Sequence, residues 1–88
     1  MGKPESQKHE KRVFLAMTPA HIRESERADY VEVVFLESAR FYRLFKKNPA
    51  YHEIVKLLRH AIAKKRALQV RCMSPESNAI AEVRGLKL

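Results

Sequence analysis

The chain has 88 residues, enough for one domain with a single core, and its 45% hydrophobic content excludes an intrinsically disordered protein. Its 18 lysines and arginines outnumber its 10 aspartates and glutamates, and the net charge of +8 favours anionic partners. The two glycines, Gly2 and Gly85, are too few for a glycine-rich loop that holds nucleotide phosphates. The single cysteine, Cys72, excludes an intrachain disulfide and is expected to be a small buried side chain in a reducing compartment.

The two parts of the chain differ in composition. Residues 1–12 are polar and are predicted to form a flexible basic tail, followed by a single α+β domain over residues 13–88. The start of the chain lacks the apolar segment of a secretory signal, and no apolar run approaches the roughly 20 residues of a membrane span. We therefore expect a cytoplasmic protein.

The first half of the domain has the composition of strands. Residues 13–17 form a short apolar run and predict a strand. Residues 18–29 leave two alternatives, a short helix near 19–27 that begins at Thr18 and Pro19, or a charged hairpin loop. Residues 30–45 are rich in β-branched and aromatic side chains, and the lack of glycine or proline favours one strand bent at 37–38 over two strands.

The segment 46–66 predicts an amphipathic helix. Asn48 is suited to the N-cap and Pro49 to the first helical position, but no glycine marks the end. Apolar residues recur three and four positions apart: Tyr51, Ile54, Val55, Leu58, Ala61 and Ile62.

Two more strands are expected after the helix. Residues 67–73 alternate, with Leu68, Val70 and Cys72 facing inward, and residues 74–78 form a turn. Residues 79–88 would return as a strand with Ala79, Ala81 and Val83 on one face and Ile80, Glu82 and Arg84 on the other. A tight loop between two short strands favours an antiparallel hairpin.

Together these elements predict an α+β fold in the order β-β-α-β-β. The simplest arrangement is one antiparallel sheet of about four strands with the helix packed on one face. A small barrel closed by the helix is the alternative.

The predicted helix carries most of the net charge. Its cations follow helical spacing and would form one patch, with Glu53 the only acid. Lysines and arginines so arranged can neutralise phosphates, so we expect a polyanion, RNA or DNA, to be the ligand. The candidate binding residues are, in order of expectation, Lys56, Arg59, Lys64 and Arg66, then Arg40, Tyr42, Lys46 and Lys47.

The segment 40–47 interleaves cations with aromatic rings. Aromatic side chains on an exposed sheet face can stack on bases while neighbouring cations hold the backbone. We expect Phe41, Leu44 and Phe45 to belong to the core and Tyr42 to be the exposed aromatic residue.

Other functions have weaker support. The histidines lack the spacing of a helical metal pair, so no metal and no cofactor is expected. No recognisable nucleophile motif surrounds Ser38 or Cys72, and we predict that the protein is not an enzyme. The alternative function is a protein-interaction or homodimerisation module, because the acidic segment 18–37 could pair with the basic helix of a second copy or an exposed sheet edge could add a strand. An acidic protein partner is also possible, whereas a membrane surface is disfavoured because the core needs the apolar stripe of the helix.

Overall fold

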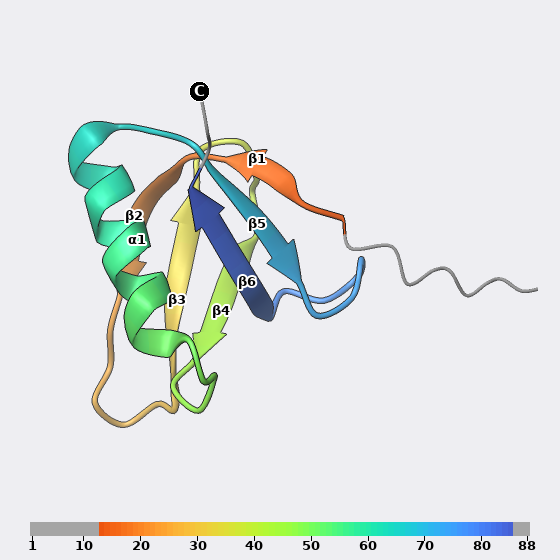
Figure 1. Ribbon diagram of the computed structural model, residues 1–88. Coiled ribbons are helices and arrows are strands. Elements are labelled where there is room, and N and C mark those ends of the chain that lie inside the picture. Colours follow the sequence, from red (N-terminus) through yellow and green to blue (C-terminus); the bar gives the residue numbers. More distant parts are fainter. Residues whose placement is uncertain (1–12, 86–88) are drawn as a thin grey trace, which may run out of the picture.

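Two antiparallel sheets and one helix make up the fold (Figure 1). The computed structural model describes residues 13–85, so the predicted tail, residues 1–12, lies outside the described residues. One sheet has the order β1-β5-β6 and the other β2-β3-β4. The bounds are β1 Leu15–Met17, β2 Pro19–Arg23, β3 Tyr30–Phe35, β4 Phe41–Phe45, α1 Tyr51–Lys64, β5 Leu68–Cys72 and β6 Ile80–Gly85. The predicted α+β class is confirmed, but the described residues form six strands in two sheets instead of about four in one.

The sheets are joined at two places. The chain crosses between them at Thr18, whose carbonyl accepts a hydrogen bond from the Leu36 N–H at 2.9 Å. At the other seam, the Arg43 N–H donates to the Asn78 carbonyl at 2.8 Å, and Arg43 and Ala79 form a short parallel bridge. The arrangement therefore lies between the open sheet and the small barrel that the sequence left as alternatives.

Residues 18–29 contain neither the short helix nor only a loop. Pro19–Arg23 forms strand β2, which pairs with β3 through a register that places Ile22 beside Val33. A helix here would have one sizeable apolar residue to hold it, whereas a strand joins its backbone groups to those of β3. The prediction of a helix near 19–27 was wrong because pairing with β3 cannot be read from this segment alone.

Residues 30–45 form two strands instead of one bent strand. β3 and β4 pair antiparallel with Val34 opposite Phe41, and the Ser38 N–H donates to the Phe35 carbonyl in the turn between them. Among the non-glycine residues 13–85, positive φ occurs at Lys65 alone. The turn at 36–40 therefore needs no left-handed residue, which explains a hairpin without glycine.

Helix α1 begins slightly later than predicted and ends on an unusual residue. The N-cap is Ala50, but Asn48 still organises the turn, because its side-chain oxygen accepts from the Ala50 N–H at 2.8 Å. The Asn48 amide also donates to the Ala81 carbonyl at 3.3 Å, which ties the helix start to β6. At the other end Lys65 adopts φ 57° and ψ 50°, a left-handed cap usually taken by glycine.

The core lies between the two sheets and is closed by α1, which packs against β2 and β6. Ile54, Leu58 and Ala61 enter it from the helix. On β6, Ile80 and Val83 are both buried although they are three residues apart. The predicted alternation on this strand was wrong because the β5–β6 register shifts between Arg71 and Cys72. The predicted hairpin itself is confirmed.

The remaining core residues come from both sheets. They are Met17, Val31, Val33, Phe35, Tyr42, Leu44, Leu68 and Val70. Within residues 13–85 no helix has the length and apolar character needed to cross a membrane.

Candidate functional site

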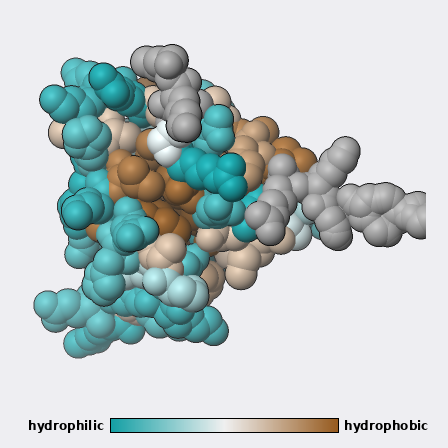
Figure 2. Space-filling view, in the orientation of Figure 1, coloured by the Kyte–Doolittle hydropathy of each residue, from teal (hydrophilic) through white to brown (hydrophobic). Residues whose placement is uncertain are grey.

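The outer side of α1 is hydrophilic (Figure 2) and carries three of the eight predicted binding residues. Lys56, Arg59 and Lys64 are exposed, and Arg66 follows just beyond the helix end. We call these four residues the basic helix face. The 14-residue helix is about 21 Å long at roughly 1.5 Å per residue, so the face presents its charges along a rigid rod.

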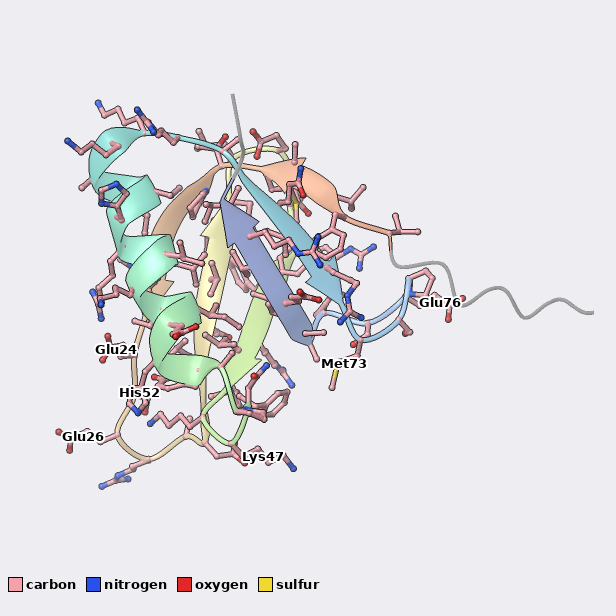
Figure 3. All side chains as sticks on the ribbon, viewed as in Figure 1. Glu24, Glu26, Lys47, His52, Met73 and Glu76 are labelled. Carbon is pink, nitrogen blue, oxygen red and sulfur yellow. The ribbon has the colours of Figure 1, made fainter. Side chains whose placement is uncertain are left out.

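Within residues 13–85, one cation of the basic helix face forms an ion pair. The Arg59 guanidinium forms an ion pair with the carboxylate of Glu24, which lies beside α1 in Figure 3. Glu24 follows β2 in the β2–β3 loop, so the acidic part of the chain lies against the basic part. Both side chains are more than half exposed, and such a pair contributes at most about 1 kcal/mol to stability. An incoming phosphate could therefore replace Glu24 at little cost.

Cations gather at the C-terminal end of the helix. Lys64, Lys65 and Arg66 are consecutive and exposed, and the helix dipole favours positive charge at this end. Beside them is an open, mainly apolar pocket of about 230 Å³ between the end of α1 and the neighbouring strands. It is lined by Leu57, His60, Ala61, Arg66, Ala67, Leu68 and Gly85.

Lys46 and Lys47 lie in the turn that leads from β4 to α1, at the opposite end of the helix. Lys46 supports the β2–β3 loop: its ammonium group donates to the Ser25 carbonyl at 3.2 Å and its N–H to the Asp29 carbonyl at 2.8 Å. Lys47 is exposed at the edge of the molecule (Figure 3). Of the two lysines, Lys46 therefore supports the β2–β3 loop, and Lys47 is the one exposed to solvent without a contact of that kind in the described part of the chain.

Tyr42 does not occupy the exposed position that was predicted for it. Its side chain is 5% exposed, packs edge-on against Phe35 with ring centroids 5.2 Å apart, and has its hydroxyl 3.2 Å from that of Ser38. Arg40 donates to the side-chain oxygen of Asn78 at 2.9 Å and lies over the Tyr42 ring. Arg40 therefore holds the β3–β4 turn against the β5–β6 connection, and the burial of Tyr42 excludes it as a stacking residue.

The prediction failed because the alternation of β4 has the opposite phase. Leu44 is buried as expected, and Tyr42, two residues away, must lie on the same face. Phe41 is 56% exposed and Phe45 is half-buried, so their assignment to the core was wrong for Phe41 and half right for Phe45.

Because β4 buries Tyr42 and Leu44, its other face belongs to an exposed sheet surface that the sequence did not predict. Val31, Val33 and Phe35 of β3 point into the core, so the intervening side chains and their cross-strand partners point away from it. We call this surface the open sheet face. It consists of His21, Arg23, Tyr30, Glu32, Val34, Phe41, Arg43 and Phe45. In the sequence, the alternation of residues 41–45 indicates two faces of a strand, but it assigns one of them to the core only when one buried residue of the strand is known.

The eight predicted binding residues therefore do not form one patch. The basic helix face lies on α1 and just beyond it, Lys46 and Lys47 lie near the helix start, and Arg40 and Tyr42 lie in and after the β3–β4 turn. The helix cations remain a candidate binding surface. Arg40, Tyr42 and Lys46 have structural contacts that account for them.

The other reactive groups show no assembled chemistry in residues 13–85. Burial raises the pKa of the half-buried Cys72 thiol, which disfavours the thiolate at neutral pH. Within the same residues no group of three histidine, cysteine, aspartate or glutamate side chains is placed to hold a metal ion.

Comparisons with known proteins give one kind of match. A scan against protein-family models and a search of curated proteins both found no match to this sequence. Among solved structures, pro-protein-glutaminase is similar with a TM-score of 0.71, 21% identity and coverage of 84% of this chain. Its A47Q2 mutant is similar with a TM-score of 0.73, 20% identity and coverage of 88% of this chain. In both cases the match spans 26% of the other chain.

This likeness is one of fold. The matched part of pro-protein-glutaminase, about a quarter of its length, has a similar fold. The sequence-based prediction that the protein is not an enzyme is contradicted by this comparison, because the fold occurs in the precursor of an enzyme.

Proposed function

We propose that this protein binds a polyanion, RNA or DNA, and that the basic helix face contacts its phosphates. The observation that supports this most is the run of exposed cations along α1 and at its C-terminal end. The ion pairs found within residues 13–85 involve Arg23, Arg59, Arg71 and Arg84, so Lys56, Lys64 and Arg66 have no carboxylate partner in this part of the chain. Phosphates would supply the missing counter-charge.

The contacts would fix position on the backbone and read little sequence. Lysine ammonium groups on a helix surface neutralise phosphates but carry no base-specific pattern. A cytoplasmic location stays part of the proposal, because both RNA and DNA can be reached there.

The test measures fluorescence anisotropy of labelled single-stranded RNA, duplex RNA and duplex DNA, each at low and at physiological salt. The wild-type protein should bind at physiological salt with an affinity that falls as salt rises. Lys64→Glu should weaken binding to every ligand and lower the salt slope by about 1.

Arg27→Glu is the matched control for that variant. It changes the net charge by the same amount, but Arg27 is exposed in the β2–β3 loop, away from the C-terminal end of α1. If both variants weaken binding equally, total charge and not the helix face is responsible. Binding seen only at low salt would refute the proposal.

A protein-interaction or homodimerisation module is the second candidate. Among residues 13–85, five large hydrophobic side chains are 55–71% exposed: Val13, Leu15, Leu36, Phe41 and Met73. Such side chains occur at protein interfaces, and the similar fold in pro-protein-glutaminase is one part of a longer chain. Sedimentation over a range of concentrations tests self-association. A monomer throughout, with Leu36→Ser behaving as wild type, would count against a homodimer.

A further inference from the structure

The open sheet face has a regular pattern of side chains. Phe41 lies opposite Val34 at one end, and Tyr30 lies opposite Phe45 at the other, with their rings edge-on at 5.6 Å between centroids. A charged row across all three strands separates these groups: Arg23, Glu32 and Arg43. Aromatic surface and charge therefore alternate along the strands.

The charged row is basic and ordered. Glu32 forms an ion pair with Arg23, with 3.7 Å between Arg23 Nε and Glu32 Oε1. On its other side Glu32 lies directly opposite Arg43. The Arg43 guanidinium lies over the Tyr30 ring, 4.9 Å from its centroid. One carboxylate between two guanidinium groups leaves positive charge, and the stacking on Tyr30 holds Arg43 in place between the two aromatic ends.

The ring of Phe41 is the most accessible aromatic surface here, at 56% exposed. Phe41 begins β4 and more than half of it is exposed, so burial in the core does not account for an aromatic ring at this position. Sheet faces that carry such rings beside arginines can stack unpaired bases while the cations hold the phosphates.

We propose that the open sheet face is a stacking surface for single-stranded nucleic acid, with a base on Phe41 and a phosphate beside Arg43. This proposal rests on the polyanion-binding function and adds the class of ligand, a single strand. Duplexes keep their bases stacked on one another, so they would reach the helix cations but not the Phe41 ring. The choice of ligand follows from complementarity between the basic charged row and a phosphate backbone.

The two surfaces adjoin. β2 is an edge strand of the β2-β3-β4 sheet and contacts α1, so Arg23 lies on the edge strand of the open sheet face that neighbours the helix. A single-stranded nucleic acid that crosses β2 could therefore stack its bases on the open sheet face and continue along the cations of the basic helix face.

The experiment compares a labelled oligouridine with an RNA duplex of the same length by fluorescence anisotropy, using the full chain. Phe41→Ala should weaken oligouridine binding by about 5- to 150-fold, the range expected for loss of one stacked base, and should leave duplex binding unchanged. Circular dichroism should show an unchanged fold, because the ring is exposed. Glu32→Gln should tighten oligouridine binding by removing the one negative charge from the row.

Met73→Ala is the matched control. Met73 is 67% exposed in the β5–β6 connection, outside the open sheet face (Figure 3), and its loss should change neither affinity. A second readout is photocrosslinking of 4-thiouridine in the oligonucleotide, which should label the β4 peptide that contains Phe41.

The possible outcomes distinguish the stacking-surface proposal from the polyanion-binding proposal on which it rests. If the wild-type protein binds both RNAs and Phe41→Ala changes neither, the stacking surface is refuted and the polyanion proposal stands. If the wild-type protein binds neither RNA at physiological salt, both the polyanion proposal and the stacking-surface proposal are refuted. If Phe41→Ala instead abolishes self-association while RNA binding is unchanged, the face is a protein interface and the proposal is overturned.

Discussion

The end of α1 provides a sharp test of the structure. Lys65 adopts a left-handed conformation, with its N–H donating to the Ile62 carbonyl at 3.3 Å and the next N–H, of Arg66, donating to the Ala61 carbonyl at 2.9 Å. An L-residue with a Cβ atom pays roughly 1–2 kcal/mol for this conformation. Glycine avoids that cost but loses roughly 0.5–1 kcal/mol more backbone entropy on folding.

Lys65→Gly should therefore stabilise the domain by roughly 1 kcal/mol or somewhat less. In a domain of this size, 1 kcal/mol raises Tm by about 4–8 °C. Chemical denaturation and thermal melting, both followed by circular dichroism, measure the change. The same variant removes one cation, so its stability is read without nucleic acid present.

Two controls isolate the backbone term. Lys65→Ala removes the charge and the long side chain but keeps the Cβ atom, so it should be less stable than Lys65→Gly. Lys64→Gly places glycine one residue earlier, at the last residue of the helix, where the backbone is right-handed and glycine should destabilise by up to about 1 kcal/mol. Equal stability of Lys65→Gly and Lys65→Ala would show that position 65 is not left-handed, and the account of this helix end would be wrong.

Three further predictions follow from single contacts. The N–H of Thr18, followed by its hydroxyl, lowers the pKa of Glu37 below its ordinary 4.5, so this carboxylate stabilises the fold above about pH 4.5 and that contribution is lost as pH falls through the lowered value. Urea denaturation at several pH values should show wild type losing more stability than Glu37→Gln between about pH 5 and about pH 3, and parallel losses would contradict the role of this contact. Asn48→Ala removes the acceptor of the Ala50 N–H and should lower the free energy of unfolding by about 1 kcal/mol. Asn48→Asp keeps that acceptor and should lose less stability than Asn48→Ala. Leu58→Ala, at a fully buried helix position, should cost about 2–5 kcal/mol in the same assay, and a loss under about 1 kcal/mol would show that the helix does not close the core.

Local patterns accounted for the elements that depend on nearby residues. The helix was predictable because its apolar residues recur at helical spacing, and the C-terminal hairpin because two alternating runs flank a turn at 74–78. The basic helix face was predictable for the same reason, since residues on one side of a helix are set by their spacing.

Predictions failed where the decisive partner is distant in sequence. β2 is a strand because β3 is available to pair with it, and the phase of β4 depends on which side of β3 is buried. A shift of one residue moves every side chain of a strand to the other face, so Tyr42 and Phe41 exchanged the roles that the sequence suggested. The Arg59–Glu24 pair likewise joins residues 35 positions apart.

The sequence by itself determined the α+β class, the position of the helix, the C-terminal hairpin and the excess of cations on α1, because each arises from side chains within a few residues of one another. The tertiary structure alone decided that six strands form two sheets, that Glu24 neutralises Arg59, and that Phe41 lies with Arg43 on an open face. These features depend on strand pairing between distant segments, and pairing is set by how the whole chain buries its apolar surface, which no single segment specifies.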